Sequence, residues 1–173
     1  MNRKVDCNLA LLTLFSLGFI ILVLTNDMYP PPLSRTHLGD SEAKYGDLTI
    51  SMKIEGIDGK RFENKYIITL ILRNEGFESY SRDLRQPVFE VYVYDFSGTF
   101  VTDWSCCNEM LDLPIPVHLD RGDEFIEVKS WFGSALDTLD CDIKPLPMGR
   151  YYIKGAWLGG PIVETGLITV DIG

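Results

Sequence analysis

The chain has 173 residues, of which 46% are hydrophobic and 12% aromatic, and it carries a net charge of −9. This composition is typical of a folded domain and excludes a largely disordered chain. The acidic balance and the lack of a basic cluster argue against binding to nucleic acid, whose phosphates need Lys and Arg, and against docking on anionic lipid headgroups.

Residues 9–25 form an uncharged, apolar run behind a basic start that contains Arg3 and Lys4. As a helix this run reaches ~25 Å, slightly less than the ~30 Å hydrocarbon core of a bilayer. The positive charges before it predict a cytoplasmic start over 1–8, a transmembrane or signal-anchor helix over 9–26, and an extracytoplasmic remainder in a single-pass membrane protein. The alternative is a protein secreted after signal cleavage, although no small-x-small site follows the run.

A proline-rich segment follows the apolar run. Pro30, Pro31 and Pro32 are consecutive, and polar residues continue to Gly46. Because consecutive prolines favour an extended polyproline conformation, we predict a linker over 27–46 that holds a domain over 47–173 off the membrane.

Alternation of apolar and polar residues with a period of two predicts β-strands from residue 48 onward. In the strand expected after the Asp120–Asp123 turn, Ile126 and Val128 alternate with Glu127 and Lys129. The expected strands cover 48–55, 66–73, 87–96, 99–104, 125–131, 150–158 and 164–172. Since Gly-rich turns separate them and no helical period follows residue 26, we predict an all-β fold, an immunoglobulin-like antiparallel β-sandwich of about seven strands.

The strand over 150–158 carries a particular expectation. Tyr151, Ile153, Gly155 and Trp157 share one face, which we expect to point into the core. Tyr151 follows Gly149 at the start of this strand, where a tyrosine corner would lie. Its hydroxyl should therefore bind a backbone group of the preceding loop.

The order of several short motifs resembles the intracellular proteinase inhibitor (BsuPI-type) family. The matching stretches are residues 73–76 (RNEG), 89–98 (FEVYVYDFSG), 103–104 (DW), 119–123 (LDRGD), 130–131 (SW) and 147–151 (PMGRY). The similarity covers residues 66–158, and it implies an immunoglobulin-like sandwich. It also implies inhibition of a serine protease, for which the segment 133–146, inserted relative to the family, would be a bait loop.

Three cysteines follow the apolar run, where an oxidising environment would allow a disulfide to persist. Either Cys106 or Cys107 could pair with Cys141, closing a loop of about 35 residues and stabilising the fold by ~3 kcal/mol in the chain-entropy model. The alternative is that all three thiols are reduced. No CxxC motif or neighbouring His completes a zinc site.

No catalytic motif is present: the sequence has no GxSxG, HExxH or P-loop. We therefore expect no enzyme, no catalytic residues, no cofactor and no metal site. Asp137, Asp140 and Asp142 lie in one segment, and Ca²⁺ binding there is an alternative, although the spacing does not match an EF-hand loop.

Three aromatic residues are the candidate partner-binding residues. Phe77 and Tyr80 lie in a polar connection, and Trp157 precedes a Gly-Gly-Pro turn. Aromatic side chains on loops can anchor a protein partner, or they can cover the ends of a core. We predict a membrane-anchored, extracytoplasmic protein-interaction or structural module of the cell envelope, which contacts the bilayer through residues 9–25 and a protein partner of unknown identity. The alternative function is a BsuPI-like serine protease inhibitor.

Overall fold

The computed structural model describes residues 34–58, 65–107, 113–137 and 142–173. Within these residues, no helical segment has the length and apolarity needed to cross a membrane. The basic start, the predicted membrane helix and the three prolines lie outside the described residues. The fold described below is that of residues 34–173 alone.

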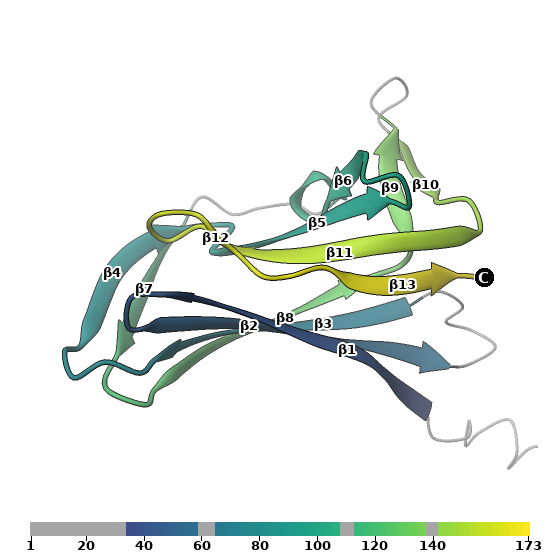
Figure 1. Ribbon diagram of the computed structural model, residues 1–173. Helices are drawn as coiled ribbons and strands as arrows, with labels where there is room; N and C mark the ends of the chain where they lie inside the picture. The colour runs from purple at the N-terminus through teal and green to yellow at the C-terminus, as the bar shows by residue number, and fades with distance from the viewer. Residues whose placement is uncertain (1–33, 59–64, 108–112, 138–141) are drawn as a thin grey trace, which may run out of the picture. The chain divides into compact units, whose positions relative to one another are not determined.

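Two antiparallel sheets contain most of the described residues and form two layers (Figure 1). The first sheet has the order β1-β2-β3-β8, and the second has the order β12-β11-β5-β6 with β13 also paired to β11. The first comprises β1 (Ser34–Tyr45), β2 (Leu48–Asp58), β3 (Lys65–Asn74) and β8 (Glu124–Trp131). The second comprises β5 (Phe89–Asp95), β6 (Phe100–Asp103), β11 (Gly149–Trp157), β12 (Val163–Glu164) and β13 (Ile168–Ile172). The predicted all-β, antiparallel architecture is confirmed, and the described part of the chain is a sandwich-like domain.

Two short ribbons flank the sheets, and a single helical turn, η1 (Ser105–Cys107), follows β6. Strand β4 (Tyr80–Arg85) pairs with β7 (Pro114–Leu119), and β9 (Ser134–Asp137) pairs with β10 (Asp142–Pro145). The alternation did not predict these four strands because they bury few apolar residues. In β4 only Leu84 is buried, and all of β10 is exposed.

The prediction of a linker up to Gly46 was wrong from residue 34 onward, because Ser34–Tyr45 is strand β1 and pairs along its length with β2. The residues of β1 that turn toward the core are the small Gly39, Ser41 and Ala43, so no apolar alternation marks the strand. The small size has a cause: a Cβ on Gly39 would lie 3.0 Å from Cγ2 of Ile168 in β13. The close approach of a strand from the other sheet therefore selects against larger side chains.

The core lies between the two sheets, where alternate residues of the central strands are buried. Tyr151, Ile153, Gly155 and Trp157 face this core, as predicted. A Cβ on Gly155 would come 2.5 Å from Cδ2 of Leu70 and 3.1 Å from Sδ of Met52. Glycine is therefore required where β11 passes closest to the first sheet. The other buried core residues include Ile50, Ile54, Ile68, Leu72, Phe89, Val91, Val93 and Val170.

The middle of strand β8 has its polarity reversed with respect to the sandwich, whereas Phe125 and Trp131 at its ends pack against the core. Ile126 and Val128 face outward and are 53% and 60% exposed, whereas the side chain of Lys129 is 1% exposed. The Lys129 ammonium forms an ion pair with Glu127, and it lies 3.8 Å from the centre of the Trp104 ring. A buried charge is tolerated only when it is paired, and these two contacts supply the pairing.

The buried Asn74 amide, at the end of β3, joins three segments of backbone. Its Nδ2 donates to the carbonyl oxygens of Glu78 at 2.7 Å and of Leu119 at 3.0 Å, and its Oδ1 accepts from the Gly76 N–H at 3.0 Å. This amide holds the connection to β4 and the end of β7 against the first sheet.

The Asn74 backbone also holds the turn between β7 and β8. Its N–H donates to the Asp123 carbonyl at 3.1 Å, and its carbonyl accepts from the Gly122 N–H at 2.7 Å. Gly122 has φ +85°, a left-handed conformation that favours glycine. The Arg-Gly-Asp tripeptide at 121–123 is thus part of a turn that is bonded to β3.

Substitution of Asn74 by Asp should lower the free energy of unfolding by at least about 3 kcal/mol, because an ionised carboxylate cannot donate to the two carbonyls and stands buried against them. Urea unfolding at neutral pH measures the loss. Burial raises the pKa of such a carboxyl in the folded state, so the deficit should shrink toward acid pH, where the protonated group regains a donor. A variant as stable as the unaltered protein at neutral pH would contradict the assigned hydrogen bonds.

The hydroxyl of Tyr151 donates to the Pro147 carbonyl at 3.0 Å, so the predicted bond from this tyrosine to the preceding loop is confirmed. Tyr151→Phe should therefore cost about 1 kcal/mol in unfolding free energy, the usual net value of one such bond. Tyr152→Phe is the matched control, because this neighbour faces the other side of β11, and it should shift the denaturation midpoint much less. Equal effects of the two substitutions would argue against a special role for the Tyr151 hydroxyl.

Candidate functional site

The three aromatic candidates lie in different environments. Phe77 is 85% exposed in the connection between β3 and β4, with the Arg121 guanidinium carbon 4.1 Å from its ring centre. Tyr80 is partly buried at the start of β4. Trp157 is 2% exposed, in agreement with its expected place on the core-facing side of its strand. Trp157 ends β11 on the inward face of the strand, and its indole belongs to the core.

Tyr80 and Trp157 meet at one end of the sandwich. Their ring centres are 6.3 Å apart with an interplanar angle of 64°, an edge-to-face arrangement that aromatic pairs favour. The Tyr80 hydroxyl donates to the Gly159 carbonyl at 3.0 Å. Burial raises the pKa of Tyr80, so this hydroxyl stays protonated and keeps its role as a donor at physiological pH.

The Gly-Gly-Pro turn passes close to the indole, which explains why its first residue is glycine. A Cβ on Gly159 would clash with the Trp157 ring and would lie 2.7 Å from Cδ1 of Leu84. The turn can therefore lie against the tryptophan only without a side chain at this position. Gly160 and Pro161, which follow, continue over the edge of the ring.

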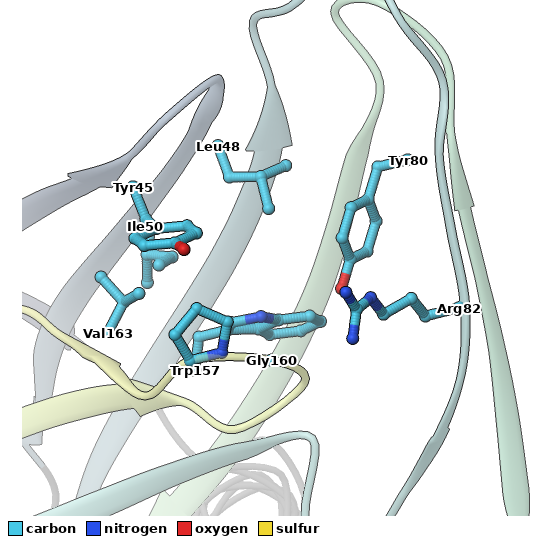
Figure 2. A pocket seen from close by; sticks show the side chains of 9 residues that line it. Tyr45, Leu48, Ile50, Tyr80, Arg82, Trp157, Gly160 and Val163 are labelled. Carbon is cyan, nitrogen blue, oxygen red and sulfur yellow. The ribbon is translucent and has the colours of Figure 1, made fainter.

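These residues surround a small pocket, shown in Figure 2. Trp157 and the turn at Gly160 form one side, and Tyr80 and Arg82 of β4 form another. The pocket has a volume of about 60 Å³. The lining residues are Tyr45, Leu48, Ile50, Tyr80, Arg82, Trp157, Gly160, Pro161 and Val163.

The size and polarity of the pocket limit what it can hold. Sites for whole small molecules usually measure ~300–1,000 Å³, whereas this pocket is about 60 Å³, room for part of one side chain. Among the nine described residues that line it, only Arg82 carries a charge, and its guanidinium lies beside the Tyr80 hydroxyl (Figure 2). The pocket therefore suits an apolar group with a carboxylate next to it.

Sequence reasoning had found Tyr80 and Trp157 but missed the rest of this pocket. Tyr45 lies at the end of β1 and Arg82 lies in β4, two strands that the alternation did not reveal. Tyr80 and Arg82 are two residues apart and share one face of β4, but this spacing alone does not place either residue beside Trp157. Leu48 and Ile50 lie in a predicted strand, but nothing in the sequence places them near Trp157.

The other predicted sites have the following outcomes. Cys106 is exposed in η1, and Cys141 lies outside the described residues, so the predicted disulfide stays a prediction. Asp140 of the aspartate segment also lies outside them. Among the residues that the structure does describe, no three His, Cys, Asp or Glu side chains gather in a way that could hold a metal ion.

The chain thus forms a β-rich, sandwich-like domain. No family model and no curated protein matches it. Among solved structures it is similar to a part of the β-glucosidase from Listeria innocua in complex with isofagomine, with a TM-score of 0.41 and 11% identity over 72% of this chain and 16% of that chain. It is also similar to the GH3 β-glucosidase of Bifidobacterium adolescentis, with a TM-score of 0.37 and 14% identity over 81% of this chain and 17% of that chain. A third is the β-D-glucoside glucohydrolase of Trichoderma reesei, with a TM-score of 0.37 and 13% identity over 82% of this chain and 19% of that chain. The chain spans less than a fifth of the length of each of these proteins.

The different environments of the aromatic residues predict different costs of truncation. Trp157→Ala should lower the free energy of unfolding by about 3–5 kcal/mol, because it removes a buried ring from the core. Phe77→Ala should cost less than about 1 kcal/mol, because only the Arg121 contact is lost. Thermal unfolding of the two variants under the same conditions measures both. A large loss in the Phe77 variant would show that this ring closes the core rather than standing free of it.

Proposed function

We propose that this chain is a non-catalytic protein-interaction module of the cell envelope. An immunoglobulin-like sandwich over the C-terminal part carries the binding site. Residues 9–25 anchor it in the membrane, and the proline-rich segment around 30–32 holds it on the extracytoplasmic side. The motifs shared with the BsuPI-type family and the charge pattern around the apolar run support this arrangement.

The pocket at Trp157 is the observation that carries the proposal. Its volume of about 60 Å³ suits one side chain of a partner protein rather than a whole metabolite. Aromatic rings and a proline line it, and such residues are frequent at the centres of protein interfaces because they bury much area at little entropic cost. The partner is therefore a protein that inserts one side chain here.

The residues that line the pocket at Trp157 indicate which partner side chain it would bind. Tyr45, Leu48 and Val163 offer apolar contact, which an aliphatic side chain or proline satisfies. The guanidinium of Arg82 offers a fork of N–H donors at the rim, which matches a carboxylate. The partner segment thus has an apolar residue followed by Asp or Glu.

Binding of short peptides to the full-length protein in nanodiscs tests this function. Fluorescent peptides with Val, Leu or Pro before Asp or Glu should bind at least about tenfold more tightly than the same peptides with Lys in the acidic position. Arg82→Ala should abolish this preference, and Tyr45→Ala should weaken binding of both sets. Arg73→Ala, an exposed arginine of β3, is the control and should bind as the unaltered protein does.

Two results would contradict the proposal. One is equal affinity for the acidic and the basic peptides in the unaltered protein. The other is an acidic preference that persists after Arg82→Ala, since the charge recognition would then lie elsewhere on the molecule.

The alternative function, inhibition of a serine protease, rests on the resemblance to the BsuPI-type family. A panel of serine proteases incubated with the full-length protein at micromolar concentration separates the two functions. Dose-dependent inhibition would favour the inhibitor. Unchanged protease activity together with peptide binding at Arg82 would favour the interaction module.

A further inference from the structure

The outer face of the second sheet carries a row of aromatic side chains. Phe100 of β6 pairs with Tyr94 of β5, and Tyr94 pairs with Tyr152 of β11, so the three residues lie in register across three strands. Neighbouring strands are ~4.8 Å apart, so the row is as long as two to three sugar rings in an extended chain. The Phe100 ring meets Tyr94 edge to face, with ring centres 6.0 Å apart and an interplanar angle of 74°, and it meets Tyr92 in the same manner at 6.4 Å and 64°.

Part of this aromatic surface is open to solvent, whereas Tyr94 and Tyr152 are half-buried and the Lys154 ammonium lies 5.6 Å from the centre of the Tyr94 ring. Phe100 is 51% exposed, and Phe96, in the turn that follows β5, is 75% exposed. On the opposite face of β5 the residues Phe89, Val91 and Val93 fill the core. The sandwich therefore does not need the outer aromatic residues for its own packing, and a clustered exposed aromatic patch is a mark of a binding surface.

A shallow hollow adjoins the row and adds polar groups to it. Phe96, Tyr152, Arg150 and Asp171 line this hollow, which has a volume of about 480 Å³. Nε of Arg150 lies 3.0 Å from Oδ1 of Asp171, and Nη2 lies 3.4 Å from Oδ2. The hollow is wide and open to solvent, and it has both aromatic rings and a pair of opposite charges.

We propose that this outer face, which we call the aromatic platform (Tyr94, Phe96, Phe100, Arg150, Tyr152 and Asp171), binds a neutral, extended oligosaccharide. A pyranose ring has an apolar C–H face that stacks on an aromatic ring. Its hydroxyl groups project sideways, and each can both donate and accept a hydrogen bond. Adjacent hydroxyls therefore match a neighbouring donor and acceptor, which Arg150 and Asp171 present side by side.

The charges of this face and of the whole chain favour a neutral glycan over an acidic one. Arg150 is paired with Asp171, and Lys154 is paired with Glu164 at 2.9 Å, so the positive groups of this face are already matched by carboxylates. The chain as a whole has a net charge of −9, which repels uronate or phosphate polymers. The competing interpretation is that this face binds a protein, and titration with oligosaccharides distinguishes the two kinds of ligand.

The platform is separate from the pocket at Trp157. None of its six residues lines that pocket, and Tyr94 and Tyr152 lie on the outward face of strands whose inward face builds the core. The two sites can therefore be altered independently. Loss of peptide binding and loss of glycan binding are then separate results.

The probes are cellohexaose and chitohexaose, with an oligogalacturonate of similar length as the acidic comparison. Calorimetric titration of the full-length protein in nanodiscs should show binding of at least one neutral oligosaccharide and none of the acidic one. Phe100→Ala and Tyr152→Ala should weaken binding by at least about tenfold. Tyr152→Phe keeps the stacking ring and should retain most of the affinity. Phe77→Ala, another exposed aromatic, is the control and should change nothing.

Circular dichroism of each variant establishes whether the fold is intact. Because Phe100 is half exposed on a short strand, Phe100→Ala should disturb the fold less than the other truncation. The proposal is overturned if neither neutral oligosaccharide binds the unaltered protein, which would leave this face to a protein partner. It is also overturned if the acidic oligosaccharide binds as well as the neutral ones, or if the Phe100 and Tyr152 truncations bind as tightly as the Phe77 control.

Discussion

The side chain of Asn74 holds together parts of the domain that no sheet connects. A buried amide without partners would cost several kcal/mol, and Asn74 avoids that cost by bonding to Gly76, Glu78 and Leu119. These contacts tie the β4–β7 ribbon to the first sheet. Because β4 carries Tyr80 and Arg82, one wall of the pocket at Trp157 depends on an amide that does not line the pocket itself.

The two candidate surfaces use the sandwich in different ways. The pocket lies where the core ends, so its floor is a core residue, Trp157, and its shape follows from the packing of the two sheets. The aromatic platform lies on the outward face of the second sheet, away from the core. The pleat and the register of the strands position its side chains. A rigid β-domain can thus carry one site that is coupled to its stability and another that is not.

The sequence predicts those strands whose inward residues are large and apolar, and it fails where they are not. Strands β2, β3, β5 and β11 were each expected: β2 alternates clearly, and β3 is apolar on both faces. Strand β1 has the small residues Gly39, Ser41 and Ala43 on its inner side, and so it resembles a linker. At Gly39 the close approach of Ile168 leaves little room for a side chain.

The same limit applies to the candidate site. Tyr80 stood out as an aromatic residue in a polar segment, but nothing local indicates that Arg82 faces Trp157 across a ribbon paired with β7. The inward place of Trp157 was expected from its strand, but nothing local indicates that the Gly-Gly-Pro turn covers its ring, which the glycine at 159 allows. The approach of Arg82 to Trp157 and the covering of the Trp157 ring both depend on contacts between segments that are distant in sequence.

The reversed polarity of β8 has a consequence for how its register is specified. A slip of one residue against β3 would bury Ile126 and Val128 and release Lys129 to water, but it would also expose Phe125 and Trp131, which pack against the core at the two ends of the strand. In the middle of the strand the slip is also opposed by Trp104, whose ring lies against the Lys129 ammonium and whose Nε1 donates to the Ser130 carbonyl at 3.0 Å. The alignment of this edge strand is therefore fixed by its two inward aromatic residues together with the contacts of Trp104, and not by the apolar residues at its centre. A minimised or circularly permuted version of the domain would need to keep the β6–η1 corner, because without Trp104 the buried Lys129 would lose one of its two partners.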